Sequence, residues 1–239
     1  MGEHVSVGCE RPIIFSAPMV RALLVGTKTQ TRRVVKPQLN DHHWYKLPGY
    51  THHVSVHPNA DGCAVHSCHM WAQSGADGMQ RIQSPYGGVG DRLWVRETWL
   101  ELDRDHWADP SAPKQDILCH PWPRANACAY RSDTTSDGDD IRKAYGYRWR
   151  PSIHMPRWAS RITLEITDVR AQRLQDISEE DARAEGVKPA PFCKAGRPNG
   201  LEHVESFEQL WDSINGAGAW DGNPWVWAIT FKRAEVANG

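Results

Sequence analysis

A short polar loop carries the residues of this sequence that are best suited to chemistry. Lys28, Thr31 and Arg33 follow Gly26 at spacings of two, three and two residues. If residues 31–33 are extended, Thr31 and Arg33 point to the same side of the chain, and Lys28 can fold back over them from the loop. The spacing therefore predicts an amine, a hydroxyl and a guanidinium in one cleft.

Two kinds of chemistry are open to these three side chains. Lys28 and Arg33 can hold a phosphate, with the Thr31 hydroxyl as a further partner. Alternatively, Lys28 loses its proton in a partly dry pocket and activates Thr31 as a nucleophile. A solvated basic loop without a function is the plain alternative, and spacing alone does not separate the three.

The pattern G-x-K-x-x-T-x-R at residues 26–33 resembles the hallmark motif of ASCH domains, and it follows a predicted strand and short helix as it does in that family. Residues 90–99 (GDRLWVRETW) are similar to the second segment of the family, a glycine-led strand that ends in a polar pair. Residues 149–162, 210–211 and 225–227 look like a phage and prophage branch. The resemblance leaves out residues 38–85 and 103–148.

Membership of this family implies a PUA-like barrel with a cleft for RNA, nucleotides or modified bases. One bacterial branch consists of amidohydrolases that remove the acetyl group from N(4)-acetylcytidine with a Lys, a Thr and a Glu. By resemblance those catalytic roles fall to Lys28, Thr31 and Glu97. A carboxylate beside Lys28 would raise its pKa and burial would lower it, so the balance decides whether Lys28 is a base at neutral pH. Another branch is linked to RNA cleavage, which makes a ribonuclease a further alternative.

A non-catalytic module that binds RNA, single-stranded nucleic acid or a modified base is the main alternative to an enzyme. Besides Lys28, its phosphate contacts would come from arginines, and its base contacts from tryptophans on which a base can stack. The residues singled out for substrate binding are Arg33, Trp94, Arg96, Trp99, Arg157 and Trp158. A structural role in phage assembly is a third alternative.

The elements that must position these residues follow from hydrophobic periodicity. Residues 12–15 read as a buried strand, and a helix begins after Ser16 and ends at Gly26. Residues 91–102 read as a strand whose alternation breaks near Glu97. The remaining segments are a strand over 161–174 with a bulge near Asp168, helices over 178–185 and 207–214, and a last strand over 224–233. Without a βαβ rhythm, they predict an α+β fold, a mixed barrel with short flanking helices.

The sequence is expected to form one domain over residues 1–239, with irregular insertions at about 38–85 and 103–148. Its 28 Lys and Arg residues balance 29 Asp and Glu residues, so attraction of nucleic acid would have to be local. No run of about 18 apolar residues and no apolar leader occurs, which predicts a cytoplasmic protein with reduced cysteines and no membrane partner.

A metal site is a weak alternative within the first insertion. Cys63, His66, Cys68 and His69 place four soft ligands within seven residues, and Cys119, His120 and Cys128 lie in the second insertion. Structural zinc sites usually show two ligand pairs with tighter spacing, so no metal cofactor is predicted and zinc is kept only as an alternative.

Overall fold

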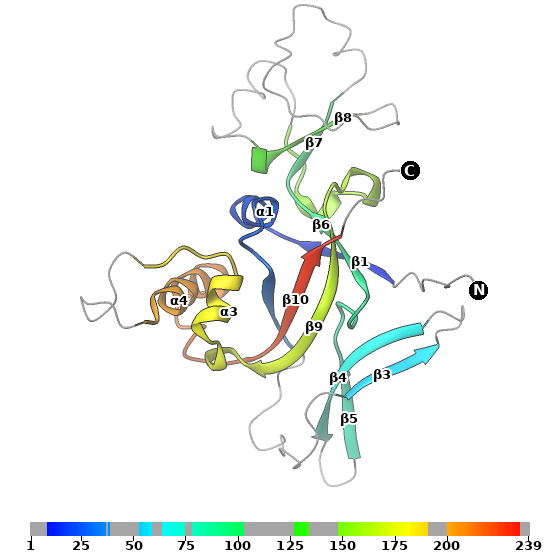
Figure 1. The fold of residues 1–239 in the computed structure, drawn as a ribbon, viewed down its shortest axis with the longest axis vertical. Coiled ribbons are helices and arrows are strands. Elements are labelled where there is room, and N and C mark those ends of the chain that lie inside the picture. Colours follow the sequence, from blue (N-terminus) through cyan, green and yellow to red (C-terminus); the bar gives the residue numbers. More distant parts are fainter. Residues whose placement is uncertain are drawn as a thin grey trace, which may run out of the picture.

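A five-stranded sheet in the order β1-β6-β9-β10-β2 forms the centre of the protein (Figure 1). The structure is a computed structural model that describes residues 9–36, 38, 53–58, 64–74, 78–102, 127–133, 148–190 and 200–234. The strands are β1 (Glu10–Ile14), β2 (Gln30–Val34), β6 (Arg92–Arg96), β9 (Thr163–Arg173) and β10 (Trp225–Arg233). β1 pairs with β6 in parallel, and the other neighbours are antiparallel.

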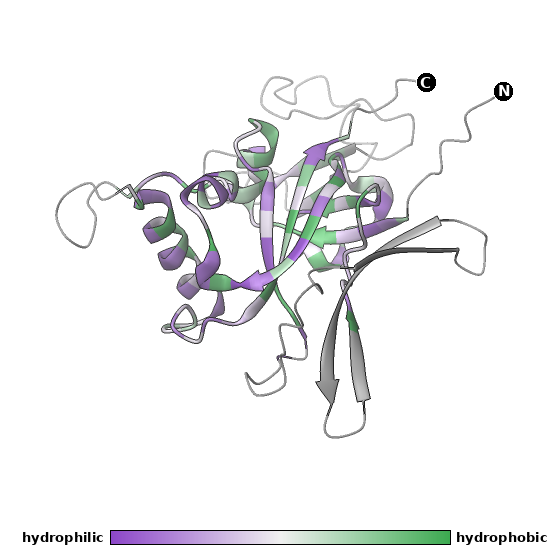
Figure 2. Ribbon diagram, turned by 60° about the horizontal axis from the view of Figure 1, so that its bottom comes forward, coloured by the Kyte–Doolittle hydropathy of each residue, from purple (hydrophilic) through white to green (hydrophobic). Residues whose placement is uncertain are grey.

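One face of this sheet carries the main hydrophobic core. Side chains alternate between the two faces of each strand, as the stripes of hydropathy along the strands in Figure 2 show. On β10, Trp227, Ile229 and Phe231 enter the main core, whereas Val226 packs into a second core beneath the helices. The predicted bulge near Asp168 is confirmed by a register shift opposite Thr230 and Phe231.

The sheet curls so that its two edge strands approach each other without pairing. The Arg33 guanidinium on β2 donates a hydrogen bond to the carbonyl of Ile14 on β1. Arg33 also lies over the ring of Phe15, the residue after β1, at 5.2 Å. The α+β fold is thus confirmed, whereas the described strands form an open, curled sheet and not a closed barrel.

Among the described residues, three α-helices and several short 3-10 segments accompany the sheet. The helix α1 (Ala17–Leu24) links β1 to β2, and α3 (Glu179–Ala184) and α4 (Glu202–Asn215) pack together (Figure 1). Ser178 caps α3 by accepting a hydrogen bond from the Asp181 amide at 3.1 Å. The 3-10 segments are η3 (Arg131–Asp133), η4 (Ser152–His154), η5 (Arg157–Ala159) and η6 (Leu174–Asp176).

The first insertion contains a regular sheet, which corrects the expectation of an irregular stretch. The strands β3 (His53–Pro58), β4 (Ala64–Ser74) and β5 (Gly78–Gln83) form an antiparallel meander. The alternation of Val54 and Val56 with polar residues is a strand pattern that the His- and Gly-rich composition obscured.

The predicted strand over residues 91–102 breaks at Glu97 and Thr98, as its pattern indicated. β6 ends at Arg96, and the separate strand β7 (Trp99–Leu102) pairs with β8 (Ala127–Tyr130). The break therefore separates the main sheet from the second insertion. Within the described residues, none of the helices has the length and apolar character needed to span a membrane.

Candidate functional site

The loop before β2 and the strand itself present their polar side chains to different surroundings. Gln30 and Arg32 share the face of β2 that meets α3, where their side chains contact Asp181. Thr31 and Arg33 occupy the opposite face, in register with Ile229 and Trp227 of the main core. The predicted common orientation of Thr31 and Arg33 is therefore present.

Lys28 is buried, and its three nearest acceptors come from two elements. Nζ donates to the Gln30 carbonyl at 2.9 Å, and to the Glu185 carbonyl and the Glu185 carboxylate at 2.8 Å each. Only 2% of Lys28 and 4% of Glu185 are exposed, so little water competes for these contacts. The loop before β2 and the residue at the end of α3 thus form one buried ion pair.

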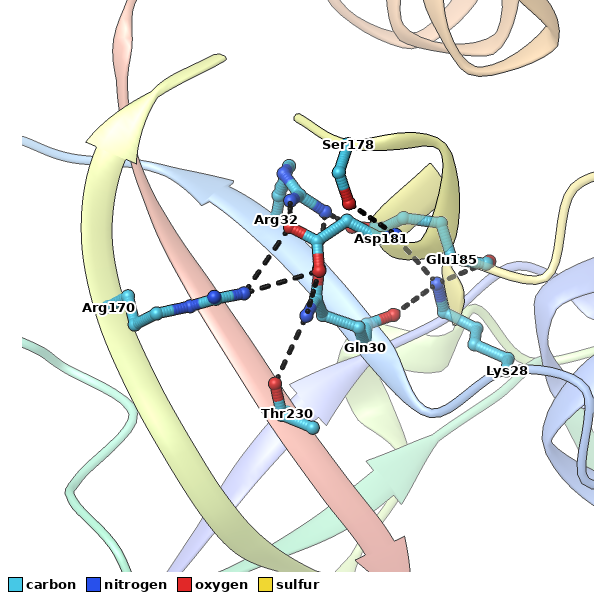
Figure 3. A network of polar contacts seen from close by, with 8 residues as sticks. All are labelled: Lys28, Gln30, Arg32, Arg170, Ser178, Asp181, Glu185 and Thr230. Carbon is cyan, nitrogen blue, oxygen red and sulfur yellow. Dashed lines mark hydrogen bonds and ion pairs between the residues drawn. The ribbon is translucent and has the colours of Figure 1, made fainter. Parts of the chain in front are cut away.

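A second cation joins Lys28 in a continuous polar network between β2 and α3 (Figure 3). Arg32 donates to Asp181 at 2.7 Å and to Glu185 at 3.1 Å, and its side chain is fully buried. Gln30 donates to Asp181 and to Thr230 of β10 at 3.1 Å. The network fixes the Glu185 carboxylate from two sides and locks α3 onto the sheet.

Burial and the neighbouring carboxylate act on the pKa of Lys28 in opposite directions. Burial has the larger effect and lowers the pKa of Lys28 below its ordinary value, while the charge and hydrogen bond of Glu185 raise it. For Asp181, burial raises the pKa of the carboxyl group. The opposite effects of Arg32, Gln30 and Arg170 are together larger than that of burial, so the pKa of Asp181 is lowered. The site therefore combines the Asp181 carboxylate, which its neighbours hold in the charged form, with the Lys28 amine, which loses its proton more easily than a solvated lysine.

A pocket of about 90 Å³ opens along the edge of β2 next to this network. Thr31, Arg33 and Glu185 are among the residues that line it. Its apolar walls come from α1 and α4, through Met19, Phe207, Leu210, Trp211 and Ile214. Within the described residues the Thr31 hydroxyl has no hydrogen-bond partner, and Lys28 and Thr31 are not bonded to each other.

Arg33 is a partly buried cation that lacks an acidic partner among the residues described. Burial lowers the pKa of Arg33, while its electrostatic interactions with Tyr86 and Glu185 raise it. Its protein contacts are the Ile14 carbonyl and the Phe15 ring, over which Lys28 Nζ also lies at 5.6 Å. A cation held in this way beside a pocket is suited to an anionic or acceptor-rich ligand.

Glu97 does not contact Lys28, which corrects the expected arrangement. The Glu97 carboxylate is buried and accepts hydrogen bonds from Arg161 at 3.0 Å and from Ser132 at 2.6 Å. Arg161 bonds Asp133 as well, at 2.7 Å, and stacks on the Tyr130 ring at 4.0 Å. A buried carboxylate is stable only when hydrogen-bond donors compensate its charge, and Arg161 and Ser132 supply those donors to Glu97. Since Ser132 belongs to η3, Glu97 ties the end of β6 to η3.

The residues predicted to bind phosphates and bases fall into two groups. Arg96 stacks on Trp94 at 4.6 Å and has no acidic partner within the described part of the chain. Arg157 is instead paired with Glu10 at 2.8 Å. Trp99 is buried and packs edge-on against Trp158 at 5.7 Å, so Trp99 offers no free face for a base.

The side chains of most residues considered as metal ligands lie outside the described part of the chain. Cys63 lies outside the described residues, as do the side chains of His66, Cys68 and His69 on β4 and both Cys119 and His120. Cys128 is a buried cysteine on β8. Among the described residues, no three His, Cys, Asp or Glu side chains are grouped as a metal site requires.

Gly186 allows α3 to end directly above Lys28. Its φ is +80°, and a Cβ there would lie 2.9 Å from the Lys28 Cβ and 3.1 Å from the Ala22 Cβ. We expect Gly186→Ala to lower the free energy of unfolding by about 1–3 kcal/mol, because it adds both backbone strain and a clash. Chemical denaturation measures this change.

The matched control is Gly218→Ala, since Gly218 has a φ of +77° with no atom within 4 Å of the added Cβ. Gly218→Ala should therefore carry only the backbone cost. Equal effects of the two substitutions would show that the space above Lys28 is not tightly packed.

The sequence-based interpretation missed Glu185 and Asp181. Their signal was present, because both lie in the predicted helix over 178–185, which stops at a glycine. The Asp181 carboxylate binds Arg32 and Gln30 across the gap between α3 and β2. No family model, curated protein or solved structure matches this chain.

Proposed function

We propose that the chain is an ASCH-type, PUA-like protein that hydrolyses the N-acyl group of a modified pyrimidine nucleoside such as N(4)-acetylcytidine. The observation that carries this proposal is the buried Lys28–Glu185 pair at 2.8 Å, next to a pocket that Thr31 and Glu185 line. The curled sheet, in which Arg33 of β2 reaches Ile14 of β1, supports the PUA-like part of the proposal.

In this reaction Lys28 is the general base and Thr31 the nucleophile. As Thr31 Oγ1 bonds to the acyl carbon, its proton passes to the neutral Lys28 amine. The tetrahedral species then breaks the bond to the exocyclic nitrogen, which takes that proton and leaves as the free amine of cytidine. Water hydrolyses the acyl-threonine ester, so the products are cytidine and acetate. A neutral amine keeps two N–H donors, so one of the three contacts of Lys28 must be released to turn its lone pair toward Thr31.

In this proposal Glu185, and not Glu97, is the carboxylate that positions Lys28. Its carboxylate holds Nζ in place, and Arg32 fixes that carboxylate from the other side at 3.1 Å. Because the carboxylate raises the pKa of Lys28 against the stronger effect of burial, Glu185 also sets the pH at which the base becomes available.

The pH dependence of hydrolysis should report this balance. Activity should rise with pH as Lys28 loses its proton, with an apparent pKa below that of a solvated lysine. Glu185→Gln removes the charge that raises the pKa of Lys28, so the acidic limb should move to lower pH. Profiles of kcat/KM for the wild type and Glu185→Gln measure the shift, and a limb that stays in place or moves to higher pH would contradict the role of Glu185.

Pure binding of a nucleotide or single-stranded nucleic acid is the second function for which the geometry offers support. Arg33 and Arg96 have no acidic partners among the described residues, and Arg96 offers a guanidinium plane over Trp94. Such a module would bind oligonucleotides with an affinity that falls as salt is added.

Incubation of the purified protein with N(4)-acetylcytidine separates the two functions. We expect cytidine and acetate to appear in equal amounts, and N(4)-methylcytidine, which has no acyl group, to remain unchanged. If cytidine is not released while oligonucleotides bind in a salt-dependent manner, the protein is a binding module and the hydrolase proposal is wrong.

A further inference from the structure

The outer edge of β2 presents backbone groups that the β-sheet does not use. Phe231 donates to the Thr29 carbonyl and Val35 donates to the Trp225 carbonyl, each at 2.9 Å. Residues alternate in an antiparallel ladder, so residues 29, 31, 33 and 35 face β10. The N–H and C=O groups of Arg32 and Val34 therefore point away from β10. The Gln30 carbonyl, which points the same way, accepts its bond from Lys28.

This outer edge lies in the pocket. Residues 31–34 line the pocket together with Met19 from α1 and with Leu210 and Ile214 from α4. In the described part of the chain, β2 pairs with β10 alone. The backbone groups of Arg32 and Val34, which point away from β10, form no hydrogen bond to any other described residue. The pocket thus combines a polar backbone edge with apolar walls, which suits a flat ring that has polar atoms on its rim.

The free edge is too short to receive another strand. Lys28 occupies the outward carbonyl of Gln30 at one end, and β2 itself ends at Val34 at the other. Within β2, Arg32 and Val34 are the two residues whose outward N–H and C=O groups both lack a hydrogen bond to a described residue, whereas strands usually contain about three to ten residues. A single planar group fits this edge better than an extended peptide.

The order of the two groups selects the kind of ring. The Arg32 carbonyl accepts and the neighbouring Val34 N–H donates, and this pair is complementary to an exocyclic amino group beside a ring nitrogen. Cytosine and its N(4)-acylated form carry that pair. Uracil carries a carbonyl beside a ring N–H, so both contacts would be repulsive.

We propose that the edge of β2 at Arg32 and Val34 recognises the amino edge of cytosine or N(4)-acylcytosine and rejects uracil. The assignment of a nucleoside as the occupant rests on the proposed function. Met19 lies on the α1 wall of the pocket and Leu210 and Ile214 on the α4 wall, where each can pack against a face of the ring. An N(4)-acyl group held by the Arg32 carbonyl would lie beside the adjacent residue, Thr31.

Val34→Pro tests this recognition, because proline removes the outward N–H without removing a bond of the β2–β10 ladder. Val34→Ala is the matched control, since it shortens the side chain and keeps the N–H. Titration calorimetry should show that wild type and Val34→Ala bind cytidine more tightly than uridine. Val34→Pro should bind cytidine about three- to tenfold more weakly than Val34→Ala, with uridine little changed. Equal cytidine affinities of the two variants would overturn the proposal.

Amide NMR of the wild type keeps the proposal testable if Val34→Pro does not fold. Addition of cytidine should shift the Val34 amide most strongly, and uridine should leave it in place. The proposal is overturned if no nucleoside binds, or if a short extended peptide shifts that amide and cytidine does not. Binding is measured without turnover, so failure of hydrolysis alone would contradict the proposed function and leave this inference intact.

Discussion

Thr31→Val is expected to abolish the release of cytidine from N(4)-acetylcytidine, with a loss of at least about 10³-fold in kcat. Valine nearly matches threonine in shape but has no hydroxyl to attack the acyl carbon. Within the described residues the Thr31 hydroxyl has no hydrogen-bond partner, so its removal should change thermal stability little. Product analysis by chromatography, with a melting curve of the same sample, measures both quantities.

Thr31→Ser is the control for this substitution, because serine keeps the hydroxyl at the same position. We expect the serine variant to retain measurable hydrolysis, although its freer rotation lowers the rate. If the valine variant hydrolyses the substrate as fast as the wild type, Thr31 is not the nucleophile and water must be activated in another way.

Arg32→Met is expected to give the largest loss of stability, about 3–5 kcal/mol in the free energy of unfolding. Arg32 is fully buried and contacts both Asp181 and Glu185, so its removal leaves two carboxylates without their shared cation. Urea denaturation measures the loss. Because Arg32 also orients Glu185, hydrolysis should fall as well.

The control for the effect of burial is Lys232→Met. Lys232 forms an ion pair with Glu165 at 3.1 Å, but its side chain is 63% exposed. Exposed pairs contribute about 1 kcal/mol or less, so this substitution should hardly change stability. Similar losses for Arg32→Met and Lys232→Met would mean that the network between β2 and α3 does not hold the fold together.

Much of the main sheet and of the helices around it could be predicted from the sequence, because local patterns determine these elements. Ser178 and the acidic residues after it indicate the start of α3, and a glycine marks the end of α1, of α3 and of α4. The strict alternation over residues 161–174 indicates β9, and its interruption locates the bulge. The loss of alternation at Glu97 likewise predicts the break between β6 and β7.

The carboxylate partner of Lys28 could not be predicted in the same way. Glu185 is 157 residues from Lys28 in sequence, and their contact depends on how α3 packs against β2. Glu97 was assigned by resemblance, and it is indeed buried, but Arg161 and Ser132 use its oxygens. A motif identifies which residue types are present, whereas packing decides which of them meet.

The same limit applies to the pocket. Its apolar walls come from α1 and α4, and residues 31–34 of β2 also line it, with outward backbone groups that no side-chain motif can indicate. The orientation of those groups follows only from the register between β2 and β10. The alternation over residues 53–57, by contrast, was an available signal that composition obscured.

The most direct test of the account is the release of cytidine from N(4)-acetylcytidine by wild type and by Lys28→Met, with circular dichroism to establish that both are folded. Methionine keeps the length of the side chain and has no amine to accept a proton. The account predicts release by the wild type and a loss of about 10²- to 10⁴-fold in the variant, the usual contribution of a general base. No release by the wild type, or equal release by folded Lys28→Met, would contradict it.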